Sequence, residues 1–188
     1  HGTCVIDQRE IRSDAHSFAE ALRSVFRQSP DVILVGEMRD LETIQLAITL
    51  AETGHLILGT LHTQDTAHAI SRIIDVFPTN QQQQVYTQLS MALQGVIAQL
   101  LIPKADGSGR VLACEVLNVN SAIRNLIREA EVQQIYSVIQ TNRASGMVTM
   151  NDSLAELYFG GVISEEDALN KSPRPTELSK IFERNKRR

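Results

Sequence analysis

The stretch SPDVILVGEMRD, Ser29 to Asp40, joins an apolar run to a charged end. Four branched apolar residues without polar alternation, Val32 to Val35, predict a strand that is covered on both faces. The run breaks at a glycine, and Glu37, Arg39 and Asp40 follow. In an open parallel sheet, ligands bind beyond the carboxyl ends of the strands. We therefore expect Glu37 to point into such a crevice, where a carboxylate can deprotonate a water or hold Mg²⁺ through water, as phosphoryl transfer requires.

A simpler interpretation of this charged end stays open. An apolar strand followed by glycine and glutamate is also typical of a solvated strand end, with Asp40 as the N-cap of the next helix. The apolar stripe after Asp40 predicts that helix, and Gly54 is placed to end it at C′. A second apolar run, HLILGTL from His55 to Leu61, predicts another strand. Strand, helix and strand in succession favour a parallel sheet.

The flanking segments extend this α/β pattern. A capping box, Ser17 with Glu20, opens a helix before the first strand. The apolar spacing from Asn80 to Leu100 predicts one long helix. After the turn PKADGSGR, the run RVLACEVLNV from Arg110 to Val119 predicts a further strand.

The last third of the chain predicts helices alone. Helical periodicity recurs in segments after about residue 120. The expected helices are Ala122 to Glu129, Glu131 to Gln140, Asp152 to Phe159, Ser164 to Asn170 and Thr176 to Arg184. We therefore expect an α/β domain over residues 1–118, with a mainly parallel sheet, and an all-helical region over residues 119–188.

The composition is that of an ordinary soluble protein. Of 188 residues, 43% are hydrophobic, and the net charge of −4 gives no overall attraction to nucleic acid or anionic membrane. No apolar run approaches the length of a membrane span. Cys4 and Cys114 fit no zinc or disulfide framework, so we expect a cytoplasmic setting. The chain starts without Met, and we expect it to be a piece of something longer.

Two blocks of sequence carry a family resemblance. FRQSPDVILVGEMRD, residues 26–40, followed by TGHLILGTLHT, residues 53–63, strongly resembles the Walker B and His-box region of the secretion and type IV pilus ATPase superfamily. Members of that superfamily are hexameric RecA-like motors, so the resemblance implies that residues 1–118 are the C-terminal portion of a RecA-like ATPase core. It also implies that Glu37 is the catalytic Walker B glutamate and that Gly36 replaces the aspartate of many other Walker B motifs.

The resemblance gives roles to the remaining signature residues. His62 is the histidine that faces the γ-phosphate, His55 begins the same box, and Arg39 and Asp40 lie near the nucleotide and its Mg²⁺. Position alone leaves a structural role open for both histidines. His55 and His62 are seven residues apart, so on one ideal strand they face opposite sides and do not chelate a metal. No protein side chain is expected to bind Mg²⁺ directly.

The sequence contains no phosphate-binding loop of the form G-x-x-x-x-G-K-[ST]. GHLILGTL has two glycines at that spacing, but Thr60 and Leu61 stand where Lys and Ser/Thr are required. The superfamily carries the loop upstream, together with an acidic box and an N-terminal domain. We therefore expect this chain to hold half of an ATP and Mg²⁺ site and to be inactive alone, because phosphate binding needs the loop's N–H groups and lysine.

A third block, AIRNLIRE, narrows the resemblance to the pilus retraction ATPases, together with QIYSVIQT and GMVTMNDSL. Secretion and pilus-extension members usually carry a four-cysteine zinc site, which two lone cysteines cannot build. The motif consists of Ala122, Ile123, Arg124, Asn125, Leu126, Ile127, Arg128 and Glu129. We expect a helix capped by Ser121, with the three aliphatic residues Ile123, Leu126 and Ile127 packed inward and with Arg124, Asn125 and Arg128 outward. Like charges at i and i+4 indicate a surface for an acidic partner, with a plain solvated face as the alternative.

The resemblance implies a subunit of a homohexameric motor that couples ATP hydrolysis to type IV pilus retraction and twitching motility. Such a motor works in the cytoplasm, peripherally at the inner membrane, on the membrane platform of the pilus machine. Two alternatives stay open. One is a sibling motor for secretion, pilus assembly or accessory retraction. The other is a non-catalytic interaction module, if the parent gene lacks the phosphate loop. We expect no nucleic-acid partner and no membrane span.

Overall fold

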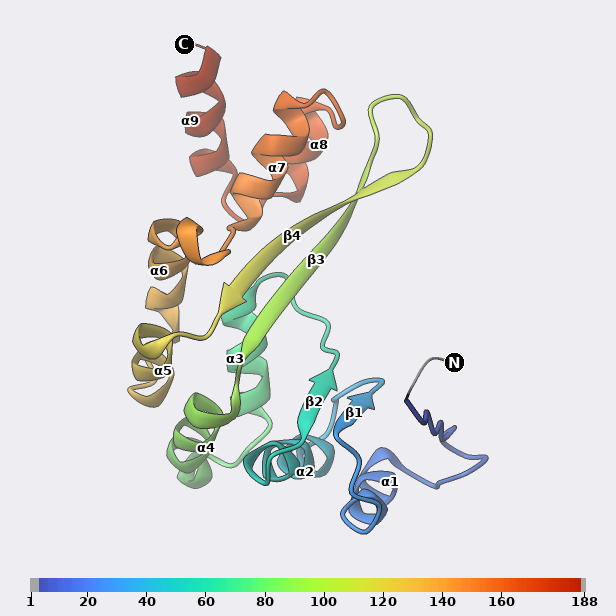
Figure 1. Cartoon of the computed structure of the whole chain (residues 1–188). Helices are drawn as coiled ribbons and strands as arrows, with labels where there is room; N and C mark the ends of the chain where they lie inside the picture. Colours follow the sequence, from blue (N-terminus) through green and yellow to red (C-terminus); the bar gives the residue numbers. More distant parts are fainter. Residues whose placement is uncertain (1–3, 187–188) are drawn as a thin grey trace. The chain divides into compact units, whose positions relative to one another are not determined.

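A computed structural model describes residues 4–186 of the chain (Figure 1). Its contacts divide it into two compact units, one ending at Leu61 and the other beginning at His62. The predicted boundary between residues 118 and 119 follows the change from an α/β to an all-helical sequence pattern and stays a prediction. The ends of those two ranges, residues 1–3 and 187–188, lie outside the described residues.

The first unit is a parallel strand pair with two helices. Its elements are α1 (Phe18–Val25), β1 (Val32–Val35), α2 (Leu41–Glu52) and β2 (Leu56–Gly59). β1 and β2 pair in parallel, in a register that runs from Val32 opposite Leu56 to Val35 opposite Gly59. The predicted capping box is confirmed, since Ser17 Oγ accepts a hydrogen bond from Glu20 N at 3.1 Å. The parallel pair and the helix between its strands are as expected.

One face of this strand pair is exposed. Ile33 and Val35 are buried among residues of α1 and α2, but Val32 and Leu34 are 52% and 71% exposed. Leu56 and Leu58, their partners in the register, are exposed as well. The prediction that β1 is covered on both faces is therefore wrong for this chain. An uninterrupted apolar run indicates that both faces of a strand are suited to apolar contacts. Among the described residues, no element covers the second face of β1.

The second unit is built on a long antiparallel hairpin flanked by helices. Its strands are β3 (Gly95–Pro103) and β4 (Arg110–Asn118), joined by the predicted turn. The helices are α3 (Thr66–Asp75), α4 (Thr79–Ala92), α5 (Ser121–Arg128), α6 (Ile135–Thr141), α7 (Met150–Phe159), α8 (Glu165–Lys171) and α9 (Pro175–Lys186), with short 3₁₀ turns at Val132–Gln134 and Arg143–Ser145. The predicted all-helical region after residue 120 is present.

The long helix expected from Asn80 to Leu100 is wrong. α4 ends at Ala92, Leu93 has an extended backbone, and Val96 and Leu100 lie in β3. Gly95 disfavours a continuing helix, the two β-branched residues after it favour a strand, and pairing with β4 satisfies the backbone there. The sequence prediction also missed α3, although Asp65 caps it and its apolar residues recur at helical spacing.

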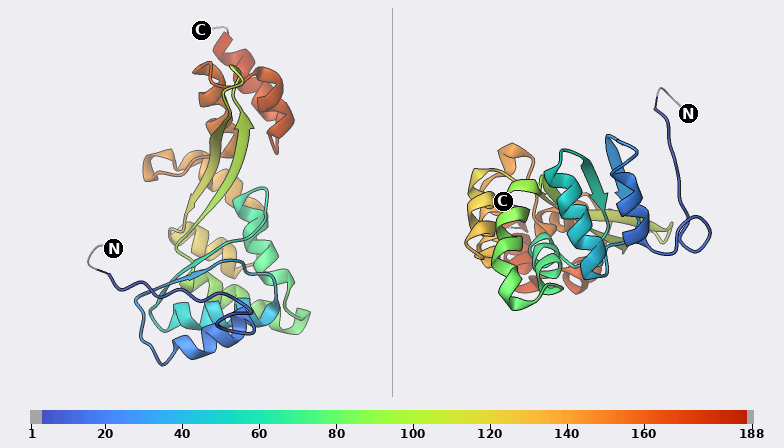
Figure 2. Two further views of the ribbon diagram at one scale, coloured as in Figure 1. Left: turned by 90° about the vertical axis from the view of Figure 1, so that its right-hand side faces the viewer. Right: turned by 90° about the horizontal axis from the view of Figure 1, so that it is seen from below.

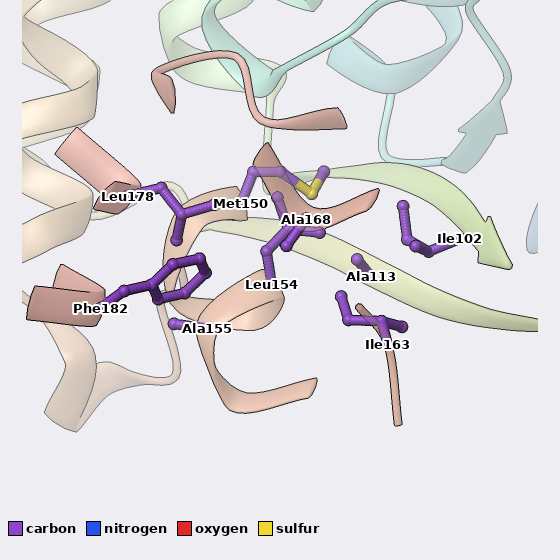
Figure 3. Packing of buried hydrophobic residues seen from close by; sticks show 9 residues of the cluster. All are labelled: Ile102, Ala113, Met150, Leu154, Ala155, Ile163, Ala168, Leu178 and Phe182. Atoms are coloured by element: carbon purple, nitrogen blue, oxygen red, sulfur yellow. The ribbon is translucent and has the colours of Figure 1, made fainter. Parts of the chain in front are cut away.

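An apolar cluster holds α7, α8 and α9 on the hairpin (Figure 3). α7 packs against β4, α8 packs against β3, and α9 closes the cluster from the other side. The buried members are Ile102, Ala113, Met150, Leu154, Ala155, Ile163, Ala168, Leu178 and Phe182. Val148 adds a backbone bridge to Val116 of β4, so the segment before α7 is fixed to the hairpin by hydrogen bonds as well as by packing.

Candidate functional site

The carboxyl ends of β1 and β2 lie at one edge of the first unit, because the strands are parallel and Val35 is opposite Gly59. The chain segments beyond both ends are joined to each other. Met38 N donates a hydrogen bond to Thr60 O at 3.1 Å, and the Thr60 hydroxyl donates to Gly36 O. The two motifs GEMRD and GTLHT therefore meet directly after their strands, at the edge where parallel sheets bind ligands.

Two glycines at this edge, Gly36 and Gly59, have different surroundings. A Cβ at Gly59 would lie 2.5 Å from Met38 Cε, so the side chain of Met38 covers that glycine. A Cβ at Gly36 would meet only the ring of Phe18 at 3.8 Å, which is an ordinary contact. Space within the described residues thus explains the glycine at 59 but not the glycine at 36.

Glu37 places a partly exposed carboxylate at this edge. Its side chain is 23% exposed, and its Oε1 accepts a hydrogen bond from Arg39 Nε. That hydrogen bond, together with the attraction between the two charges, raises the pKa of the Arg39 guanidinium. A carboxylate has about four acceptor positions, so the bond to Arg39 is compatible with a water bound at the same group. The pair can hold a carboxylate in place next to an ordered water.

Asp40 has a different role, as the N-cap of α2. Its Oδ1 accepts from Thr43 N and its Oδ2 from the Thr43 hydroxyl, both at 2.8 Å. The cap satisfies a first-turn N–H that has no intrahelical partner. The simpler interpretation of the charged end is therefore correct for Asp40. Its predicted place near the nucleotide stays a prediction.

The structure places His55 away from Glu37. His55 precedes β2, at the opposite end of the strand pair from Glu37, which follows β1. Its Nδ1 lies 3.1 Å from Leu50 O and 3.1 Å from the Thr53 hydroxyl, at the end of α2. These contacts are typical of a structural histidine. His62 follows β2 by three residues and is exposed, and its predicted contact with a γ-phosphate stays a prediction.

The AIRNLIRE motif forms α5, and its apolar face is buried as expected. Ile123 and Ile127 are fully buried, while Leu126 is half-buried. The N-cap is Asn120 instead of the predicted Ser121, since its Oδ1 accepts from Ile123 N at 3.0 Å. The helix packs along α4, as both views in Figure 2 show.

Arg124 does not face outward, and the prediction that it does is wrong. Its Nη1 donates to Ser90 O and Met91 O, both at 2.8 Å, and its Nη2 donates to Gln94 Oε1 at 3.3 Å. Ser90 and Met91 are in the last turn of α4, where carbonyls lack intrahelical partners. A long side chain can reach around a helix to such acceptors. Arg124 is a C-terminal cap of α4.

Arg128 faces outward as predicted. Its guanidinium is exposed and donates to Asn125 Oδ1 at 2.6 Å, and Glu129 lies on the same exposed side. This contact joins neighbours on one helix and reaches no other element. The exposed part of the motif therefore consists of Ala122, Asn125, Arg128 and Glu129.

Residues 4–186 show neither a cluster of metal ligands nor a membrane-crossing helix. No three His, Cys, Asp or Glu side chains within that range are grouped as ligands for a metal ion. In the same range, no helix combines the length and the apolar character that crossing a bilayer requires.

Comparison with known proteins identifies the class. The family model described as Type II/IV secretion system protein matches residues 6–166, and the chain belongs to this family. The match includes the two strand ends, the hairpin and AIRNLIRE.

Several relatives are named for pilus retraction or twitching motility. The chain is 53% identical to the type IV pilus retraction ATPase PilT of Pseudomonas aeruginosa over 172 residues, 92% of this chain and 50% of that protein. It is 51% identical to the twitching motility protein of Neisseria gonorrhoeae, over 93% of this chain and 47% of that protein. A crystal structure of the pilus retraction motor PilT with bound ADP matches with a TM-score of 0.86 at 54% identity, covering 94% of this chain and 49% of that one. The chain thus spans about half the length of these relatives.

Proposed function

We propose that this chain is part of a motor ATPase that couples ATP hydrolysis to type IV pilus retraction. The observation that carries the proposal is the placement of Glu37 beyond the carboxyl end of a parallel strand, held by Arg39 and joined to the GTLHT segment. The 53% identity to a retraction ATPase supports the same function.

Glu37 acts as the general base. It takes a proton from the water that attacks the terminal phosphate of ATP, while Arg39 keeps the carboxylate aimed. The Glu37 carboxylate at this edge suits the side of a phosphate site where the metal ion binds, because a carboxylate can hold hydrated Mg²⁺ through water. The bound Mg²⁺ supplies charge neutralisation on the phosphates. A phosphate-binding loop is needed beside it, and residues 1–188 contain no G-x-x-x-x-G-K-[ST] motif.

The motor works as a homohexamer in the cytoplasm, at the inner-membrane platform of the pilus machine. Within the subunit, AIRNLIRE divides into two parts. Arg124 and the buried isoleucines fix α5 on α4, and the exposed residues Asn125, Arg128 and Glu129 face a partner. A basic side chain on this surface suits an acidic patch on the platform or on a neighbouring subunit.

The test is Glu37→Gln in the full-length protein. Because the amide cannot accept the proton, we expect turnover to fall by about a hundredfold or more while nucleotide affinity is kept. Steady-state hydrolysis is measured beside calorimetric binding of Mg-ATP. The matched control is Glu42→Gln, an exposed glutamate of α2 that pairs with Arg23; it should leave turnover unchanged. Turnover of Glu37→Gln within a few-fold of the parent would end the assignment of Glu37 as the base, and a parent that hydrolyses no ATP would favour a non-catalytic interaction module.

A further inference from the structure

Glu115 is a buried carboxylate in the middle of β4, with 2% of its surface exposed. Its Oε1 accepts hydrogen bonds from the backbone N–H and the hydroxyl of Thr66, at 2.9 and 2.7 Å. Its Oε2 accepts from the backbone N–H of Met150 at 3.2 Å. Desolvating a carboxylate is costly, so donors on both oxygens are needed to hold the charge in the interior.

Both donors stand at the same kind of position, the first residue of a helix. Thr66 opens α3 and Met150 opens α7. The first N–H groups of a helix lack intrahelical partners and carry the positive end of the helix dipole. The N-caps of the two helices, Asp65 and Thr149, accept from N–H groups three residues after the cap, those of His68 and Asp152. Glu115 therefore supplies a contact that neither cap makes, and it does so for two helices at once.

One of these helix starts is close to the His box. Thr66 follows His62 by four residues, and the segment between β2 and α3 has no regular secondary structure. The bonds to Glu115 fix the far end of that segment. The other helix start belongs to the C-terminal region, because α7 is the central helix of the apolar cluster in Figure 3.

We propose that Glu115 is a positioning residue for His62. Through Thr66 it determines where the His62 segment ends, and through Met150 it makes that position depend on how the C-terminal helices pack. The inference rests on the proposed ATPase function, because that function gives His62 a γ-phosphate to contact.

Glu115→Gln separates the charge from the size of the side chain. The amide has nearly the same shape, but one oxygen becomes an N–H donor. If its oxygen faces Thr66, its NH₂ group faces the N–H of Met150; in the other orientation it faces the donors of Thr66. In either orientation a donor opposes a donor, and one of the two helix starts loses its anchor.

The experiment measures ATP hydrolysis by the full-length protein carrying Glu115→Gln. We expect kcat to fall about tenfold or more with KM changed less than about twofold, since misplacing a group that contacts the transition state lowers turnover without removing substrate binding. Glu166→Gln, on the exposed side of α8, is the matched control and should behave as the parent. Equal losses in Glu115→Gln and the control would overturn the proposal.

A double-mutant cycle tests whether Glu115 acts through His62. In a His62→Ala background, Glu115→Gln should lower kcat no further, whereas independent sites give additive losses. If Glu115→Gln fails to fold, Thr66→Val takes its place, because it removes only the hydroxyl donor; Thr66→Ser should then restore kcat. Additive losses in the cycle overturn the role of Glu115 and leave the ATPase proposal standing. A parent that hydrolyses no ATP overturns both.

Discussion

Replacing Arg124 by Gln should destabilise the chain, while the same replacement at Arg128 should not. Arg124 donates two hydrogen bonds of 2.8 Å to the last carbonyls of α4, and it is half-buried between α4 and α5. The guanidinium of Arg128 is exposed and contacts Asn125 and Glu129, while its backbone carbonyl accepts from Gln83 of α4 at 3.1 Å, a bond that a side-chain replacement leaves in place. The two arginines are four residues apart in one motif, so each is a matched control for the other.

The magnitude follows from these contacts. Hydrogen bonds from a charged donor contribute about 1.5–3 kcal/mol each when buried, and a cation at a helix C-terminus adds about 0.3–1 kcal/mol. Water reaches part of this site, so the freed carbonyls regain some hydration. We therefore expect Arg124→Gln to lower the unfolding free energy by about 1–2 kcal/mol in total. Arg128→Gln should change it by about 0.5 kcal/mol or less.

Urea unfolding followed by far-ultraviolet circular dichroism measures this difference. With an m-value of about 2 kcal/mol/M, the midpoint for Arg124→Gln should fall by about 0.5–1 M at unchanged slope. Equal midpoints for the two variants, or a larger fall for Arg128→Gln, would refute the assignment of Arg124 as a cap of α4. The result also decides which arginine can be used to test the coupling of ATP hydrolysis to pilus retraction. Charge reversal at Arg124 would disturb the fold as well as any partner surface.

Three further predictions concern the helical region. In the full-length protein, Arg128→Glu should keep hexamer assembly and ATP turnover but abolish twitching; normal twitching would contradict the coupling role. Ala130 has φ 59° where the N–H of Glu131 bonds to Leu126 O and closes α5, so Ala130→Gly should raise the unfolding free energy by about 0.5–1 kcal/mol, and a lower urea midpoint would count against this. Burial and the hydrogen bond to Glu177 raise the pKa of Tyr136, so the unfolded chain loses that proton first above about pH 10 and stability falls there. Tyr136→Phe should lose less stability between about pH 8 and about pH 11, and an unchanged loss in urea unfolding would contradict the assignment.

The features that the sequence predicted well are those with a local cause. The stretch DVILVGE contains a strand, the glycine that ends it and the charged residue that follows. Asp40 is a typical N-cap residue directly before α2. The positions of β1, α2 and β2 could therefore be predicted from residues close together in the chain. The retraction-ATPase resemblance rests on three such local blocks. The boundary between α4 and β3 was missed because apolar residues at helical spacing continue across it, and the pairing with β4 that ends the helix comes from later in the chain.

The missed contacts have distant partners. In the sequence, Glu115 is one charged residue in an apolar strand. The residues that donate to it, Thr66 and Met150, lie 49 and 35 residues away. Periodicity predicted Arg124 on the outer side of α5, but a period does not give the reach of a long side chain, and the acceptors of Arg124 lie 34 and 33 residues away. The exposure of Leu34 could not be predicted either, because burial depends on what surrounds a strand.

The contact between Met38 and Gly59 has a consequence for the evolution of this family. Any side chain at position 59 would have to displace the end of Met38, and the backbone N–H of Met38 is the donor that joins the two motifs beyond their strands. A lineage that acquires alanine at 59 therefore needs either a new position for the flexible end of Met38 or a shorter residue at 38. Positions 38 and 59 should covary among homologues, so that GEMRD and GTLHT are inherited as a single unit although they stand apart in the gene.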